Sequence, residues 1–97
     1  MLKSAEREAL LGFMKYNQRD LLAACRDAGC KAPTITEKIE QHKTEANKFR
    51  PRPLTNREAN MLDGWLSQNA KEFATWCGVY EVQVSQIKAA LRSMVAA

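Results

Sequence analysis

Two prolines in the segment RPRP (residues 50–53) limit what this chain can fold into. Each proline lacks a backbone N–H and clashes with the preceding helical turn, so a helix cannot pass through this segment. On both sides of it apolar residues recur at helical spacing, and no stretch shows the strict alternation typical of a half-buried strand. The sequence therefore predicts an all-α fold with two helical halves.

About six helices are expected, three in each half. In the first half we expect a helix beginning near Ser4, a second over residues 21–29 that ends at Gly29, and a third over residues 35–49 that is opened by Thr34 and Glu37 as a capping box. In the second half, Thr55 and Glu58 form another capping box, which starts a helix that includes residues 56–66, and further helices follow over residues 70–77 and 81–95.

The length of 97 residues corresponds to one small domain. We expect an N-terminal half over residues 1–48, a basic linker over 49–54 and a C-terminal half over 55–97. The halves look like a degenerate tandem repeat when Gly29 is aligned with Gly78. That alignment places Cys30 opposite Val79 and Ile35 opposite Val84.

Positive charge is concentrated in the middle of the chain. The whole chain has a formal net charge of +4, and residues 42–57 hold five basic side chains against Glu45 alone: Lys43, Lys48, Arg50, Arg52 and Arg57. Such a segment favours a polyanionic partner, most often nucleic acid, although a solvated basic linker is the simpler interpretation.

Residues 73–89 fit the residue order of a helix-turn-helix. This motif needs a small residue where two helices cross, a glycine in the turn, and two inward apolar residues on the second helix. Ala74 beside Phe73 fills the first position, and Gly78 between Cys77 and Val79 the second. Val84 and Ile87 are the expected inward pair.

On these residues, the segment 70–89 resembles the helix-turn-helix of phage Cro-type repressors. Residues 21–40, with Ala24, Cys25, Ala28, Gly29, Cys30 and the segment APTITEKIE, resemble that of LysR-type regulators less closely, with Ile35 and Ile39 as the inward pair. The Cro-type resemblance implies a DNA-binding transcriptional regulator that binds two-fold operators as a homodimer, with the start of its last helix in the major groove.

Helical geometry favours the second motif as the DNA reader. The outward face of the last helix holds the small or neutral residues Val82, Ser85, Gln86, Ala89 and Ser93, flanked by Lys88 and Arg92. The first motif instead presents Thr36, Glu37 and Glu40, and phosphates would repel the two carboxylates, so a structural or protein-binding role is expected there.

The expected DNA-contacting residues form two groups. The C-terminal motif contributes Tyr80, Glu81, Val82, Ser85, Gln86, Lys88, Ala89 and Arg92. The segment KFRPRP (48–53) and its neighbour contribute Lys48, Arg50, Arg52 and Arg57, as a basic arm against the DNA backbone.

Other kinds of site have little support. The only histidine, His42, has no evident carboxylate partner, and no phosphate-binding glycine loop is present, so no enzymatic activity is expected. Cys25, Cys30 and Cys77 fall at apolar positions without zinc spacing, and neither a metal nor a cofactor is expected. Trp65 and Trp76 are expected in the core, and Phe49 on the surface.

The sequence leads to two functional hypotheses. The first is a cytoplasmic, soluble regulator of phage or mobile-element type that binds double-stranded DNA, with no membrane segment. The second is a small helical adaptor that binds a protein of the transcription or replication machinery through the acidic face of residues 36–40.

Overall fold

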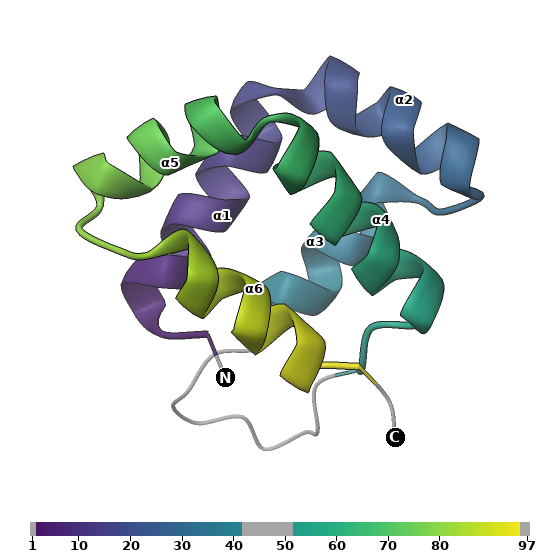
Figure 1. Cartoon of the computed structure of the whole chain (residues 1–97). Coiled ribbons are helices and arrows are strands. Elements are labelled where there is room, and N and C mark those ends of the chain that lie inside the picture. The colour runs from purple at the N-terminus through teal and green to yellow at the C-terminus, as the bar shows by residue number, and fades with distance from the viewer. Residues whose placement is uncertain (1, 42–51, 96–97) are drawn as a thin grey trace.

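The computed structural model describes residues 2–41 and 52–95 (Figure 1). Within these ranges it contains six helices and no strand, which confirms the all-α prediction: α1 (Ser4–Tyr16), α2 (Gln18–Ala28), α3 (Ala32–Gln41), α4 (Asn56–Gln68), α5 (Ala70–Val79) and α6 (Val84–Ser93). No described helix has the length and apolar character needed to cross a membrane.

The capping box predicted before α4 is present. The hydroxyl of Thr55 accepts a hydrogen bond from the Glu58 amide at 3.1 Å, and the Glu58 carboxylate accepts one from the Thr55 amide at 2.9 Å. In α1 the N-cap is Lys3 rather than Ser4, and the amide of Lys3 donates to Glu6 at 2.9 Å. In both helices a carboxylate in the first turn accepts a hydrogen bond from the backbone amide of the N-cap residue.

The capping box predicted before α3 is wrong. The helix begins at Ala32, so Thr34 and Glu37 lie inside it. Pro33 sits in the first turn, where a missing N–H costs nothing because that N–H would have no helical partner. The expected continuation of this helix to residue 49 lies outside the described residues.

The alignment of Gly29 with Gly78 is also wrong, although the two halves are alike. Gly29 ends α2 in the left-handed conformation, with φ of 74°. Gly78 lies within α5, and the left-handed residue of the second half is Glu81, with φ of 58°. The correct alignment shifts the chain by 52 positions and pairs Gly29 with Glu81.

Three further pairs support this alignment. They are Asn17 with Asn69, Cys25 with Cys77, and Ile35 with Ile87, and the members of each pair are identical. Asn17 and Asn69 end their helices with φ of −109° and −110°, and each side-chain amide donates to the carbonyl four residues earlier. The cysteines and isoleucines are buried in both halves. The repeat is therefore present in both the sequence and the structure.

The two halves interlock rather than sit side by side. α1 packs against α5, and its counterpart α4 packs against α2, so each half covers the core of the other. Figure 1 shows the α2–α3 turn and the α5–α6 turn at opposite sides of the molecule. Phe13 lies at the centre, with its ring 4.9 Å from Phe73, 5.5 Å from Trp65 and 5.9 Å from Trp76. Most of the aromatic packing thus joins one half to the other.

Candidate nucleic-acid interface

The first two turns of α6 present a small, neutral surface. Ser85, Gln86 and Ala89 are exposed, whereas Ile87 and Leu91 are buried on the opposite side of the helix. This division follows the helical period, because residues three and four apart share a face. Of the expected inward pair, Ile87 is fully buried and Val84 is only partly buried against the core.

The turn before α6 differs from the expected one. α5 continues through Gly78 and Val79, and Val79 is 80% exposed instead of flanking the turn on the inside. Ala74 is exposed too, so the helix crossing assigned to it is wrong. The helix continues because Cys77 and Tyr80, three residues apart, both face the protein interior.

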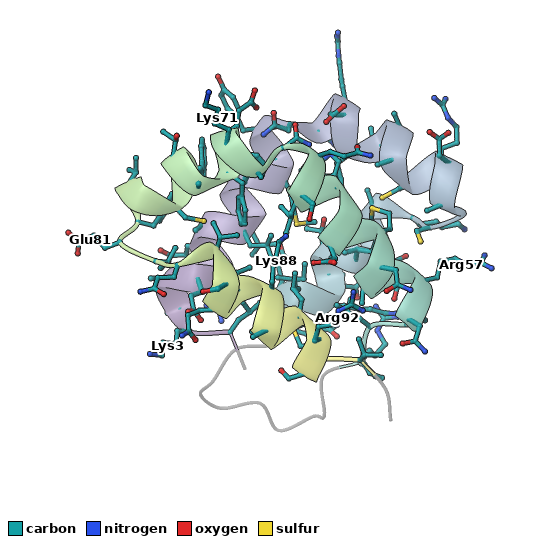
Figure 2. The ribbon with its side chains drawn as sticks, viewed as in Figure 1. Lys3, Arg57, Lys71, Glu81, Lys88 and Arg92 are labelled. Atoms are coloured by element: carbon teal, nitrogen blue, oxygen red, sulfur yellow. The ribbon has the colours of Figure 1, made fainter. Side chains whose placement is uncertain are left out.

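Two of the expected DNA-contacting residues face the protein. Tyr80 packs its ring 6.0 Å from that of Trp76, and Val82 is half-buried against the core. Glu81 is exposed in the turn and projects away from the molecule (Figure 2). Of the neutral residues expected to read DNA, only Ser85, Gln86 and Ala89 lie together on an open surface.

The two cations of α6 are held by α4. The ammonium group of Lys88 lies 2.7 Å from the Ser67 hydroxyl and 3.7 Å from Asp63. The guanidinium group of Arg92 contacts Asn60 at 2.9 Å and Asp63 at 3.4 Å. Both side chains therefore fix α6 on α4 (Figure 2), and the Asp63 carboxylate offsets part of their positive charge.

The basic arm is described only in part. Lys48 and Arg50 lie outside the described residues, as do Phe49 and His42. Arg52 is exposed, and its guanidinium group lies 3.3 Å from the Glu37 carboxylate. Arg57 is exposed in the first turn of α4 and lies against the α2–α3 turn. Arg52, which lies in the described part of the arm, thus lies beside α3.

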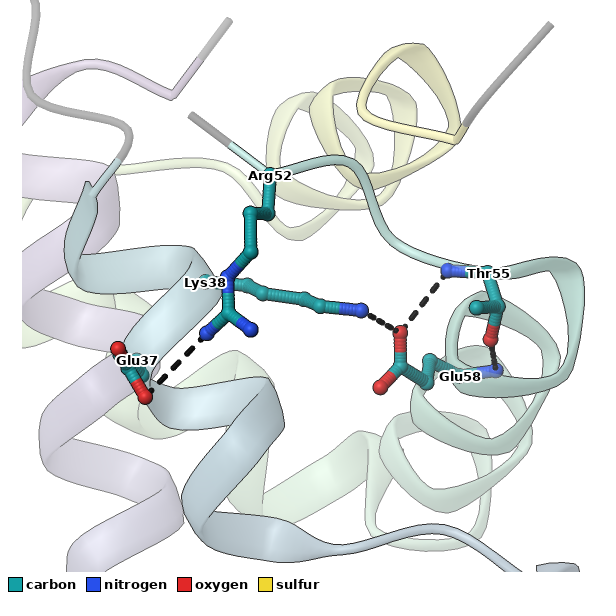
Figure 3. A network of polar contacts seen from close by, with 5 residues as sticks. All are labelled: Glu37, Lys38, Arg52, Thr55 and Glu58. Atoms are coloured by element: carbon teal, nitrogen blue, oxygen red, sulfur yellow. Dashed lines mark hydrogen bonds and ion pairs between the residues drawn. The ribbon is translucent and has the colours of Figure 1, made fainter. Parts of the chain in front are cut away.

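A buried ion pair joins α3 to α4 (Figure 3). The Lys38 ammonium group lies 2.7 Å from the Glu58 carboxylate, and the two side chains are 10% and 9% exposed. Burial alone would raise the pKa of Glu58. The hydrogen bonds from Lys38 and Thr55 and the charge of Lys38 outweigh burial and hold the pKa below its usual value. The local sequence does not reveal that Lys38 is buried, because its partner lies 20 residues away.

The cysteines behave as small apolar residues. Cys25 and Cys77 are buried and Cys30 is half-buried, and all three are free thiols. Burial raises the pKa of each thiol, so little reactive thiolate forms at neutral pH. In the part of the chain that the structure describes, no three His, Cys, Asp or Glu side chains are grouped to hold a metal ion.

A second surface lies between α1 and α5. Here a groove of about 480 Å³ is lined by Phe13, Tyr16, Asn17, Glu72, Thr75, Trp76 and Val79. Tyr16 is 77% exposed, and its ring lies 5.5 Å from that of Trp76. Exposed aromatic and branched side chains beside a groove are typical of protein-binding surfaces. Trp76, which was expected in the core, is half-buried and lines this groove, which the sequence does not reveal because it forms only where the halves meet.

Comparisons of the chain with protein-family models, curated proteins and solved structures find no match.

Proposed function

We propose that this chain is a sequence-specific DNA-binding regulator that reads the major groove with the first two turns of α6. The observation that supports the proposal is the exposed trio Ser85, Gln86 and Ala89 at the start of the second helix of a helical hairpin. In helix-turn-helix proteins this position carries the base-reading side chains.

The chemistry of these three side chains suits base edges. The amide of Gln86 can accept from N6 and donate to N7 of one adenine, which is a bidentate contact. The Ser85 hydroxyl can donate or accept, and the Ala89 methyl group can pack on a thymine methyl. None of the three is charged, so phosphate contacts must come from cations elsewhere on the chain.

The proposal also covers the class of regulator, its cellular compartment and its oligomeric state. We infer a repressor of phage or mobile-element type that acts in the cytoplasm and binds two-fold operators as a homodimer. The basic segment around Lys48, Arg50 and Arg52 would then supply backbone contacts that α6 lacks, since Lys88 and Arg92 are engaged with α4.

A salt-titrated measurement of DNA binding tests the proposal. Fluorescence anisotropy with a duplex from upstream of the gene and with random duplexes should show preference for the former. Gln86→Ala should reduce that preference by about 1–3 kcal/mol, the usual value of one bidentate base contact. Gln68→Ala, which changes an exposed glutamine of α4, is the matched control and should bind as the unmodified protein does.

Two results would contradict the proposal. One is the absence of DNA binding even at low salt. The other is binding that is equally tight for all duplexes and for Gln86→Ala, since the trio would then read nothing.

The groove between α1 and α5 favours a second candidate function, that of an adaptor for a protein of the transcription or replication machinery. The acidic face expected for this role is small, since Lys38 and Ile39 are buried and Glu37 contacts Arg52. The aromatic groove instead offers an apolar surface beside Tyr16 and Val79.

A photo-crosslinking residue at position 79 tests the adaptor role in cells. A crosslink to a transcription or replication protein that disappears with Tyr16→Ser would support it. The same residue placed at position 22, where Leu22 is exposed but outside the groove, is the control. Equal crosslinking from both positions would contradict the adaptor role.

A further inference from the structure

We propose that the pocket between the α2–α3 turn and the start of α4 binds a phosphate group. Where the chain binds DNA, as proposed above, this phosphate belongs to the DNA backbone. The assignment of this phosphate to DNA rests on the proposed function, whereas the phosphate site itself does not.

The pocket is formed by residues from both halves of the chain. Its volume is about 460 Å³, and its lining consists of Gly29, Cys30, Lys31, Thr34, Thr55, Arg57 and Glu58. Neither Lys31 nor Arg57 has an ion-pair partner among the described residues. Both are exposed, so two uncompensated cations border one cavity.

Arg57 is positioned by a glycine. A Cβ atom at Gly29 would lie 3.2 Å from the Arg57 Nη1 atom, so the guanidinium group crosses the turn where no side chain stands in its way. Figure 2 shows Arg57 on the side of the molecule where this turn lies. Gly29 also needs its φ of 74°, which other residues adopt only at a cost.

The acidic residue in the pocket is already neutralised. The Glu58 carboxylate accepts hydrogen bonds from Lys38 and from the Thr55 amide (Figure 3). The same charges act on the pKa of the Cys30 thiol. Burial and Glu58 raise this pKa and prevail, whereas Arg57 and Lys38 lower it. Lys31 and Arg57 therefore leave the pocket with excess positive charge.

The pocket also offers hydrogen-bond donors. The Thr55 hydroxyl accepts from the Glu58 amide, so its own hydrogen is free to donate outward, and Thr34 has a second hydroxyl. The first turns of α3 and α4 add partial positive charge, which reinforces the two cations. An oxyanion with several acceptor oxygens, such as a phosphate, matches this set of groups.

The repeat shows that the fold does not require these cations. At the equivalent positions of the second half, Gln83 replaces Lys31 and Ala5 replaces Arg57. That half makes its turn and starts its helix without either charge. Such a turn can thus form without Lys31 and Arg57, and phosphate binding gives both cations a role.

NMR titration with inorganic phosphate, at ionic strength matched with sodium chloride, tests the site itself. We expect the amides of residues 29–34 and 55–58 to shift in the unmodified protein. The shifts should be lost in the Lys31→Gln and Arg57→Gln variants. Lys71→Gln and Arg19→Gln, which remove exposed cations of α5 and α2 outside the pocket, should retain them. Absence of shifts, or shifts that survive both pocket substitutions, would overturn the proposal.

A second titration with duplex DNA identifies the source of the phosphate. We expect Lys31→Gln and Arg57→Gln each to weaken binding about tenfold at low salt and to lower the salt slope by about 1, while base preference is unchanged. DNA binding that depends on Gln86 but not on these cations would overturn the backbone role and leave the proposed function intact. Phosphate shifts without DNA binding would support the pocket as a site for a free phosphorylated molecule and contradict the proposed function.

Discussion

The two glycines at equivalent positions of α1 and α4 have different surroundings. A Cβ atom at Gly12 would lie 3.2 Å from the Trp76 ring and 3.4 Å from the Tyr80 hydroxyl. At Gly64, apart from the adjacent residues and the backbone of its own helix, no atom lies within 4 Å of the same point. Gly12 lets Trp76 of α5 and Tyr80, which follows that helix, approach α1, whereas Gly64 only weakens its own helix.

Alanine substitution should separate these two roles. Gly64→Ala should raise the free energy of unfolding by about 1 kcal/mol, because alanine is the better helix former. Gly12→Ala should gain clearly less, since the new methyl group presses on Trp76. Urea unfolding of the two variants measures the difference, and equal gains would show that Trp76 moves aside without cost.

Between elements, a buried charge pair joins α3 to α4. Lys38 and Glu58 satisfy each other at 2.7 Å, and the equivalent positions of the second half hold Ala90 and Glu6. The pair therefore belongs to one half only. Removing a single partner leaves a buried charge without compensation. This loss lowers the free energy of unfolding by more than the intact pair contributes to it.

Lys38→Met should lower the free energy of unfolding by about 3 kcal/mol at neutral pH. The pKa of Glu58 is lowered in the folded protein, so its stabilising effect is present above the pKa of the unfolded chain and is lost as the pH falls through the folded pKa. Urea unfolding between neutral and acidic pH should therefore show Glu58→Gln and the unmodified protein converging on acidification. A difference that stays constant with pH would contradict this account.

At the scale of the whole molecule, the halves share one core. α1 lies on α5 and α4 on α2, and the Phe13 ring contacts three aromatic rings of the second half. A half separated from its partner would expose these side chains to water. The chain should thus unfold as one cooperative unit despite its repeat.

Fragments 1–48 and 55–97 should each be largely unfolded alone, because three short helices without a covered core lie below the size that usually folds unaided. An equimolar mixture should recover helical structure, since the interlocking surfaces then meet. Far-UV circular dichroism measures both outcomes. Native-like helicity and cooperative melting in either fragment alone would show that the halves are independent.

Local sequence determined the helical class, the capping box at Thr55 and Glu58, the end of α2 at Gly29, and the burial of Ile35 and Ile39. These features depend on residues within one or two helical turns, so propensity and periodicity reveal them. The outward position of Ser85 and Gln86 also followed from the helical period.

Tertiary structure decided what depends on contacts between distant residues. It placed the second turn at Glu81 rather than Gly78, because Cys77 and Tyr80 pack inward and extend α5 past the glycine. Tertiary contacts also hold the side chains of Lys88 and Arg92 on α4 and place the Arg57 guanidinium group beside Gly29. Such contacts depend on how the two halves interlock, and a pattern read along one helix does not contain that information.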